Sequence, residues 1–299
     1  MSGAKDYIAS PAVVAYAGRQ GIDLADVARR SGRTTLARED IDNHIGNDHV
    51  KAAGGADDSR FWTVDHAAFG PVSQQPMSRI ARLAAANLSA ANRMIPQVTH
   101  HDRADMRSVE AFRKRLRPEG ESRGVRLTAL SFHVMALARC LREFPLFNSS
   151  LSADGETLIL KHYVHVGIAV DTPHGLLVPV VRDADRKGLW AIANDIADMA
   201  QRAQARKLRP EEMGGASMSI SNLGGIGGTA FTPIVNPPEV AILGITRTET
   251  VPVWEGERFA PVPMAPLDLS YDHRVANGAD AARFMARYAS LLGDIRRLL

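Results

Sequence analysis

The sequence contains a single cysteine, Cys140, among its 299 residues. One cysteine excludes an internal disulfide framework and a cysteine-based zinc cluster. No apolar run approaches the roughly 18 residues needed to cross a bilayer. The opening MSGAKDYIAS has no apolar stretch for a secretory signal. These absences predict a cytoplasmic protein without a membrane partner. Cys140 lies in an apolar helical pattern, so we interpret it as a small buried hydrophobe.

A strong excess of one charge is also lacking, since the formal net charge is only +3. Basic residues are spread along the chain, with local clusters from Arg113 to Arg117 and at Arg296 and Arg297. Such clusters are more typical of solvated helix faces than of nucleic-acid sites, so we expect no nucleic-acid partner. Scattered basic side chains are compatible with a substrate that carries phosphate groups.

The pattern divides the chain into three parts. Residues 1–45 read as a small helical unit, in which Ser10 caps a helix that begins at Pro11. Val13, Val14 and Ala17 are expected to form its apolar stripe, and a second helix is expected at 38–45, with residues 36, 41 and 45 facing inward. The polar, glycine-rich segment at 46–60 reads as a linker, and 61–299 as one larger domain.

The larger domain mixes helical and extended patterns. Helices are expected at 77–94, from Thr128 to the stop at Pro145, at 188–207 and at 278–299. Strands are expected at 164–170, 175–181, 217–221, 239–245, 250–254 and 266–270. This order predicts an α/β or α+β domain.

The segment SYDHRVANGAD, residues 270–280, places His273 between a candidate strand and a candidate helix. Loops at strand ends are positions where a rigid scaffold presents reactive groups. Imidazole titrates near neutral pH, so a histidine here is a candidate general base. From the local pattern alone, a hydrogen-bonded histidine in a structural turn remains an equal alternative.

The segment SISNLGGIGGTAFT, residues 219–232, runs from a candidate strand into four glycines. Such a loop lets backbone N–H groups of Gly224 and Gly225 approach a ligand, and Ser221 adds a hydroxyl donor. The spacing also fits a dinucleotide fingerprint, but that motif requires a helix to begin at once. The prolines at 233, 237 and 238 forbid a long helix, so we reject a dinucleotide site and a dehydrogenase.

Histidine pairs elsewhere do not predict a metal site. His100 and His101 have no third ligand at a recognisable spacing, and His162 and His165 would point to opposite faces of a strand. No G-x-S-x-G elbow is present to support a hydrolase.

Five blocks together resemble the acyltransferase component of 2-oxo acid dehydrogenase complexes. They are PMSRIARLAAANL with MIPQVTHHD (76–102), EFPLFNSSL (143–151), VGIAVDTPHGLLVPVVRDADRKGL (166–189), SISNLGGIGGTAFTPIVNPPEVAILGI (219–245) and SYDHRVANGADAARF (270–284). The resemblance implies a fold similar to chloramphenicol acetyltransferase, with a mixed sheet flanked by helices. It also implies a homotrimer, with active sites between subunits and possible assembly into a larger hollow core.

The resemblance implies roles for individual residues. His273 matches the general base that takes a proton from the attacking thiol. Ser221 matches the hydroxyl that stabilises the oxyanion, and the resemblance implies that it comes from the neighbouring subunit. Asn277 matches a position that orients a neighbouring group, although asparagine cannot supply charge stabilisation. Arg79 is a candidate contact for coenzyme A, and no metal is implied. The implied reaction moves an acetyl group between a dihydrolipoyl thiol and coenzyme A.

The N-terminal unit resembles the family's peripheral-subunit-binding domain in SPAVVAYAGRQGIDL and REDI. Its middle differs, because RRSGRTTL (29–36) replaces the expected glycine-rich loop. The implied partners are the decarboxylase and dihydrolipoamide dehydrogenase components and a lipoyl domain. None of the six lysines lies in a lipoyl-type D-K-A turn, so the lipoyl group is expected on a separate domain or chain.

Two alternatives stay open. A non-catalytic scaffold component would be expected to lack His273, which is present. A stand-alone acetyltransferase acting on a small molecule would have no need of the N-terminal unit.

Overall fold

A computed structural model describes residues 7–31, 33–41, 63–173 and 175–299. The chain divides into two compact units, Met1–Gln75 and Pro76–Leu299. The linker predicted at 46–60 lies outside the described residues.

The N-terminal unit is built around helix α1 (Pro11–Gln20). Ser10 caps this helix as predicted, with its hydroxyl accepting from the N–H of Val13 at 3.4 Å. Strand β1 (Ile8–Ala9) pairs in parallel with β2 (Thr35–Leu36), and α2 (Leu24–Ser31) lies between them in the sequence. A short 3-10 helix, η1 (His66–Phe69), also belongs to this unit. Its core contains Ala17, Leu24, Val27, Leu36 and Ile41.

Two expectations for this unit were wrong. Helix α2 was missed, because its run of charged residues gives only a short apolar stripe. Val14 was placed in the core, but it is 46% exposed, since it lies off the face shared by Val13 and Ala17. The second helix does begin at residue 38, and Ile41 is buried as expected. Ile45 lies outside the described residues.

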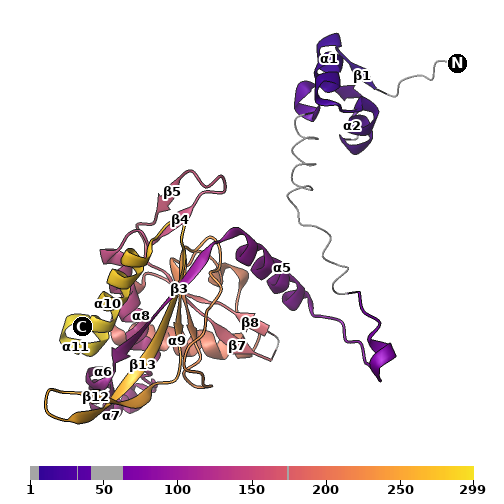
Figure 1. Ribbon diagram of the computed structural model, residues 1–299. Coiled ribbons are helices and arrows are strands. Elements are labelled where there is room, and N and C mark those ends of the chain that lie inside the picture. Colours follow the sequence, from indigo (N-terminus) through magenta and orange to yellow (C-terminus); the bar gives the residue numbers. More distant parts are fainter. Residues whose placement is uncertain (1–6, 32, 42–62, 174) are drawn as a thin grey trace. The chain divides into compact units, whose positions relative to one another are not determined.

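The C-terminal unit is a mixed seven-stranded sheet with helices packed against it, as predicted (Figure 1). Its long strand β13 pairs with β3 on one edge and with β12 and then β11 on the other. Strands β11, β10 and β6 run parallel to one another, and β9 closes the order antiparallel to β6. The bounds are β3 (Gln97–Asp105), β6 (Val166–Ile168), β9 (Val180–Val181), β10 (Met218–Asn222), β11 (Ala241–Ile245), β12 (Glu249–Trp254) and β13 (Phe259–Asp272).

Two hairpins lie outside this sheet. They are β4 (Ser149–Leu151) with β5 (Leu158–Leu160), and β7 (Val170–Thr172) with β8 (Gly175–Leu177). The segments at 164–170 and 175–181 were each predicted as one strand. Each is instead divided between the main sheet and the β7–β8 hairpin, because Ala169 separates β6 from β7 and residues 178–179 separate β8 from β9.

The α-helices of this unit begin with α5, which leads into β3. Helix α8 packs against both α9 and α10, and α10 also packs on β3. The bounds are α5 (Arg79–Met94), α6 (Arg107–Arg115), α7 (Arg117–Arg123), α8 (Ala129–Glu143), α9 (Leu189–Gln204), α10 (Gly278–Gly293) and α11 (Ile295–Leu298). The pair α6 and α7 and strand β3 were not predicted as elements. Thr128 does precede α8, but its side chain makes no capping hydrogen bond.

Alternation along β13 separates the two faces of the sheet. Leu267, Leu269 and Tyr271 belong to the same buried core as Phe132 of α8 and Phe284 of α10. The residues between them point to the opposite face, because successive side chains of a strand alternate. That second face is polar on several strands, and it carries the candidate oxyanion serine.

Helix α5 buries little apolar surface within this chain. Ala91 is its one fully buried residue, whereas Ile80, Leu83 and Leu88 are exposed. None of the helices in the described part of the chain combines the length and the apolar character needed to span a membrane.

Candidate functional site

His273 lies in the turn that joins β13 to α10. Its backbone N–H donates to the carbonyl of Pro96 at 3.1 Å, which fixes the turn against the start of β3. Its imidazole is exposed and stacks on Tyr271, with ring centroids 5.8 Å apart. The side chain is therefore held at a fixed place while its ring nitrogens remain accessible to a substrate.

Asp272 and Arg274 organise this turn. The buried carboxylate of Asp272 accepts the Arg274 backbone N–H at 3.0 Å and its Nη2 at 2.7 Å. The carboxylate beside Arg274 raises the pKa of the guanidinium. The pair positions His273 from both sides, because the two residues flank it in the sequence.

Asn277 is the N-cap of α10. Its Oδ1 accepts from the N–H groups of Ala279 and Asp280 at 2.9 and 3.0 Å, and the Asp280 carboxylate accepts the Asn277 N–H in return. This capping box fixes the end of the turn that carries His273. The sequence interpretation gave Asn277 an orienting role but did not anticipate that it caps the helix.

Ser221 lies near the end of β10, opposite Gly244 of β11, and is partly buried. The chain then enters the glycine-rich loop, where Asn222 Oδ1 accepts the N–H of Gly224 at 2.9 Å. A Cβ at Gly224 would lie 3.0 Å from that oxygen, whereas Gly225 has open space around it. No helix begins in residues 223–238, so the loop lacks the helix that a dinucleotide fingerprint requires.

One chain does not bring Ser221 and His273 together. Ser221 is level with Asp268 across the sheet, which is five residues before His273 and two strands away. At about 3.3 Å per residue and about 4.8 Å per strand, the two residues are about 19 Å apart. A site that uses both side chains therefore requires them to come from different chains.

Arg79 also lies away from His273. It begins α5, whose 16 residues lead towards Pro96 beside the histidine. With a rise of about 1.5 Å per residue, Arg79 lies about 24 Å from that end. It lines a cavity of about 560 Å³ together with Thr172 and Leu177.

A larger cavity, of about 860 Å³, adjoins the histidine turn. Asp272 and Arg274 line it, together with residues of the β4–β5 hairpin and the Pro237–Pro238 segment. Its wall contains Glu239, whose carboxyl accepts from Ser219 Oγ at 2.9 Å. Burial raises the pKa of Glu239 and lowers the pKa of the nearby Lys161. The hydrogen bond from Ser219 connects the cavity wall to strand β10. Ser219 lies two residues before Ser221.

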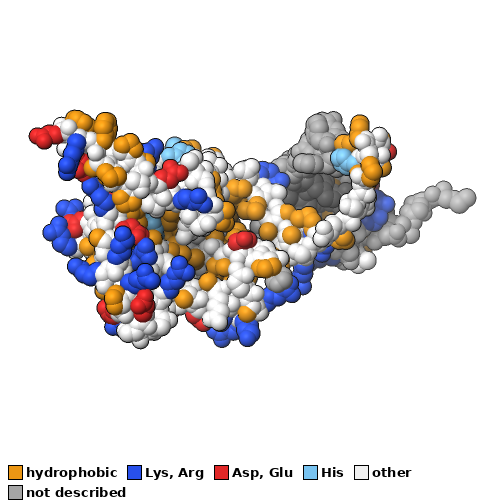
Figure 2. Space-filling view, turned by 90° about the horizontal axis from the view of Figure 1, so that it is seen from below, with side chains coloured by type: hydrophobic (Ala, Val, Ile, Leu, Met, Phe, Trp, Pro, Cys, Tyr) orange, Lys and Arg blue, Asp and Glu red, His pale blue; other side chains and the backbone are white. Residues whose placement is uncertain are grey.

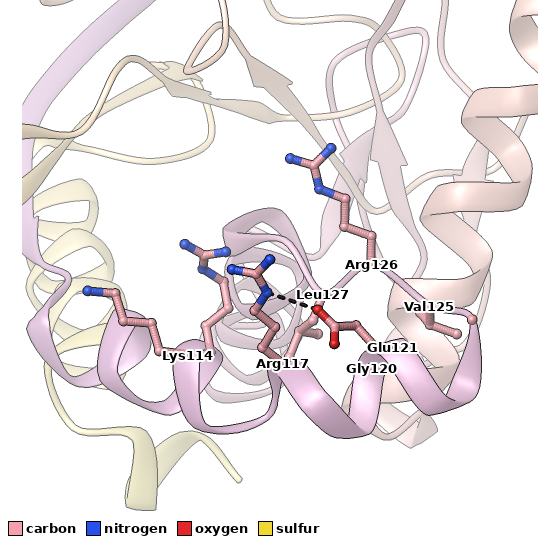
Figure 3. Close-up of a pocket in the computed structure, with 9 residues that line it drawn as sticks. Lys114, Arg117, Gly120, Glu121, Val125, Arg126 and Leu127 are labelled. Carbon is pink, nitrogen blue, oxygen red and sulfur yellow. Dashed lines mark hydrogen bonds and ion pairs between the residues drawn. The ribbon is translucent and has the colours of Figure 1, made fainter.

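A third cavity, of about 630 Å³, lies at the corner between α6 and α7 (Figure 3). Arg117 and Arg126 both extend toward its open space, and Arg117 pairs with Glu121 at 3.0 Å. Arg113 and Lys114 also line it. Lys and Arg side chains gather on the face seen in Figure 2. The sequence interpretation took 113–117 for a solvated helix face, because α6 and α7 were not recognised as the walls of one cavity.

The remaining histidine candidates fall into separate places. His165 Nδ1 accepts the backbone N–H of Asp183 at 3.0 Å, and His162 is exposed outside any strand. Within the described ranges, no three His, Cys, Asp or Glu side chains form a group suited to a metal ion. Cys140 is buried as expected, and burial raises the pKa of its thiol to about 12.

The family model of 2-oxoacid dehydrogenases acyltransferase (catalytic domain) matches residues 70–299. The chain belongs to this acyltransferase family. The match covers the sheet, its helices and the histidine turn. The predicted family and its fold class are therefore confirmed, and the N-terminal unit lies almost wholly outside the matched range.

Known members of the acyltransferase family are similar along nearly the whole chain. The acetyltransferase component of the pyruvate dehydrogenase complex of Pseudomonas aeruginosa is 46% identical over 97% of this chain and 54% of its own length. The corresponding protein of Azotobacter vinelandii is 45% identical over 100% of this chain and 48% of its own length. The chain thus spans about half the length of these curated relatives.

Solved structures of the acyltransferase family share the fold. The dihydrolipoamide acetyltransferase of Azotobacter vinelandii is 50% identical, with a TM-score of 0.78 over 79% of this chain and 97% of the other. That structure belongs to a crystallographic and enzymatic investigation of a serine, a histidine and an asparagine in its catalytic mechanism. A structure of the cubic core of a pyruvate dehydrogenase complex has the same identity and TM-score.

Proposed function

We propose that this chain is a dihydrolipoamide acetyltransferase that moves an acetyl group between a dihydrolipoyl thiol and coenzyme A. The observation that carries the proposal is a coincidence of spacing. The serine, histidine and asparagine studied in the Azotobacter enzyme are separated by 52 and 4 residues, and the same intervals separate Ser221, His273 and Asn277. The relatives named as acetyltransferases support acetyl as the group transferred.

In this proposal His273 is the general base. A thiol is a weak nucleophile until it loses its proton, because the thiolate is the reactive form. His273 takes the proton of the coenzyme A thiol, and the thiolate forms a new S–C bond to the acetyl carbon. Ser221 donates a hydrogen bond to the carbonyl oxygen while it carries negative charge. The bond to the dihydrolipoyl sulfur then breaks, and the proton returns from His273 to that sulfur.

The first test is acetyl transfer from acetyl-coenzyme A to free dihydrolipoamide. The unmodified chain is expected to be active, and His273→Ala is expected to lose a factor of about 10³ or more in kcat, because the base is removed. Absence of activity in an assembled, folded unmodified chain would contradict the proposal and favour a scaffold component.

We propose further that the active unit is a homotrimer, in which Ser221 of one chain meets His273 of another. The separation of about 19 Å within one chain supports this arrangement. Co-assembly of His273→Ala chains with Ser221→Ala chains is expected to restore about a quarter of the wild-type kcat, because random pairing leaves that share of sites intact. Either variant assembled by itself is expected to keep a low kcat. Sites formed within one chain would give no recovery on mixing.

The phosphate groups of coenzyme A are proposed to bind in the cavity between α6 and α7. Its lining carries three arginines and one lysine against the single carboxylate of Glu121. Among the described residues Lys114 and Arg126 have no ion-pair partner, so both are available to an anion. Arg126→Gln is expected to raise the KM for coenzyme A about tenfold with little change in kcat, because a charge-assisted contact is lost. An unchanged KM would exclude this position for the phosphates.

The lipoyl group is proposed to arrive on a separate domain or chain. The decarboxylase and dihydrolipoamide dehydrogenase components are proposed as partners, and trimers are proposed to assemble into a larger core. The cubic core described for a relative at 50% identity supports the last proposal. Binding of each component to the purified chain, followed by analytical ultracentrifugation, tests these partners.

A further inference from the structure

Four residues form a row across the polar face of the main sheet. Ser221 pairs with Gly244, Gly244 with Asp268, and Asp268 with His101. Residues opposite one another on neighbouring strands point to the same face. This face is the one away from the core residues Leu267 and Leu269. The row therefore places a histidine and a carboxylate on the same face as the candidate oxyanion serine, with one glycine between.

The space above that glycine is filled by Phe231. A Cβ on Gly244 would lie 2.7 Å from Cε1 and 2.8 Å from Cζ of the Phe231 ring, and 3.1 Å from Cβ of Asp268. The ring thus lies between the position of Ser221 and that of Asp268. Phe231 belongs to the loop that follows the end of β10 at Asn222, one residue after Ser221, so this ring is a wall next to the serine.

Asp268 holds Phe231 by its backbone. Oδ2 accepts the Phe231 N–H at 3.2 Å, and Oδ1 lies 2.6 Å from His101 Nδ1. The Asp268 side chain is 1% exposed, whereas that of His101 is 52% exposed. A buried carboxylate is costly unless its oxygens are hydrogen-bonded or paired with charge. His101 supplies the partner that allows Asp268 to remain buried behind the loop.

Few other side chains anchor this part of the loop. The residues around Phe231 include glycines at 227 and 228, which contribute no side-chain contacts. Thr246 Oγ1 donates to the carbonyl of Thr229 at 3.2 Å, and Arg247 donates to that of Ile226 at 2.8 Å. Of these three hydrogen bonds, the one to Asp268 is made by Phe231 itself.

We propose that His101 and Asp268 are positioning residues for acyl transfer, which hold Phe231 as a fixed wall beside Ser221. The expected effect on catalysis rests on the proposed function. A loosened wall lets the acyl group shift relative to the serine hydroxyl, and a hydrogen bond made in the transition state is sensitive to such a shift. Substrate binding elsewhere is unaffected.

The test compares Asp268→Asn and His101→Gln with the double variant. Each single change is expected to lower kcat about tenfold and to alter either KM by less than about threefold, because a contact of the transition state is weakened. The double variant is expected to resemble the more affected single variant, because the two residues act as one unit. Hydrogen exchange of the amides at 229–232 is expected to accelerate in all three.

Thr99→Val is the matched control. Thr99 Oγ1 lies 2.8 Å from Ser270 Oγ, on the same two strands and the same face, one row away from His101 and Asp268. The variant loses a hydrogen bond between β3 and β13 but keeps the contact with Phe231. Its kcat and its exchange at 229–232 are expected to match those of the unmodified chain.

The inference is overturned if Asp268→Asn leaves kcat and loop exchange unchanged, or if Thr99→Val reproduces its effects. The second outcome would mean that only strand pairing matters. The exchange measurement needs no activity. If the unmodified chain transferred no acetyl group, the proposed function would fail, while faster exchange in the two variants would still support the positioning of Phe231.

Discussion

At the scale of residues, His133 illustrates how burial alters a titratable group without giving it a catalytic role. It lies within α8, fully enclosed, with Nδ1 2.7 Å from the hydroxyl of Tyr288 on α10. Burial lowers its pKa from 6.5 to about 4. The imidazole is therefore neutral in the folded protein at pH values where an unfolded chain would already bind a proton.

This difference predicts a pH dependence of stability. The unfolded state binds the additional proton between pH 6.5 and about 4, so the contribution of His133 is fully present above pH 6.5 and is lost as the pH falls. The loss is about 3 kcal/mol in total. Urea unfolding across this range is expected to show a shallower pH dependence for His133→Asn than for the unmodified chain. Equal slopes would mean that His133 does not titrate in this way.

At the scale of elements, the turn between β13 and α10 combines a helix cap with the candidate base. Asn277 satisfies two N–H groups in the first turn of α10, four residues after His273. The same side chain therefore caps the helix and is a candidate for a role in the reaction. Loss of activity in an Asn277 variant does not by itself show which of these two roles was lost.

Two substitutions at Asn277 separate these roles. Asn277→Ala is expected to lower the free energy of unfolding by about 1 kcal/mol, because the cap is lost, and Asn277→Ser to change it by much less, because serine also caps. If Asn277 only caps the helix, Asn277→Ser keeps the wild-type kcat. A large fall in kcat with unchanged unfolding would show that the amide itself contributes to the reaction. Thermal denaturation and acetyl transfer are measured on the same samples.

At the scale of the whole molecule, α5 presents apolar side chains that this chain does not cover. Leu83 is 56% exposed, and Ile80 and Leu88 are also exposed. A row of exposed apolar residues along one helix is typical of a surface that meets another chain. The proposed trimer gives this surface a partner and brings Ser221 towards a second chain.

Leu83→Glu is therefore expected to shift the proposed trimer towards monomers and to lower acetyl transfer in parallel, because each proposed site needs two chains. Light scattering measures the mass, and circular dichroism shows whether the monomer remains folded. A variant that stays trimeric and fully active would place α5 outside the subunit interface. Lys207→Glu, a charge change outside α5, is the control.

The sequence pattern was most reliable where elements are regular and strongly apolar. Strands β10 and β11, helices α5, α8 and α9, and the turn around His273 were all predicted close to their observed bounds. The pattern failed for α6 and α7, because their charged residues suggested a solvated surface, and for β3, where paired histidines interrupt the apolar alternation. It also divided the residues at 164–181 incorrectly, since apolar content does not show where a chain leaves a sheet.

The sequence by itself determined the family, the class of fold and the candidates Ser221 and His273, because short motifs carry these properties in the order of residues. The resemblance implied that Ser221 and His273 come from different chains, and the tertiary structure supplied the physical reason, which is their separation within one chain. The tertiary structure also revealed the cavity between α6 and α7 and the contact of His101 with Asp268. These features join segments separated by many residues, and strand register and helix packing, which place them together, are properties of the folded chain.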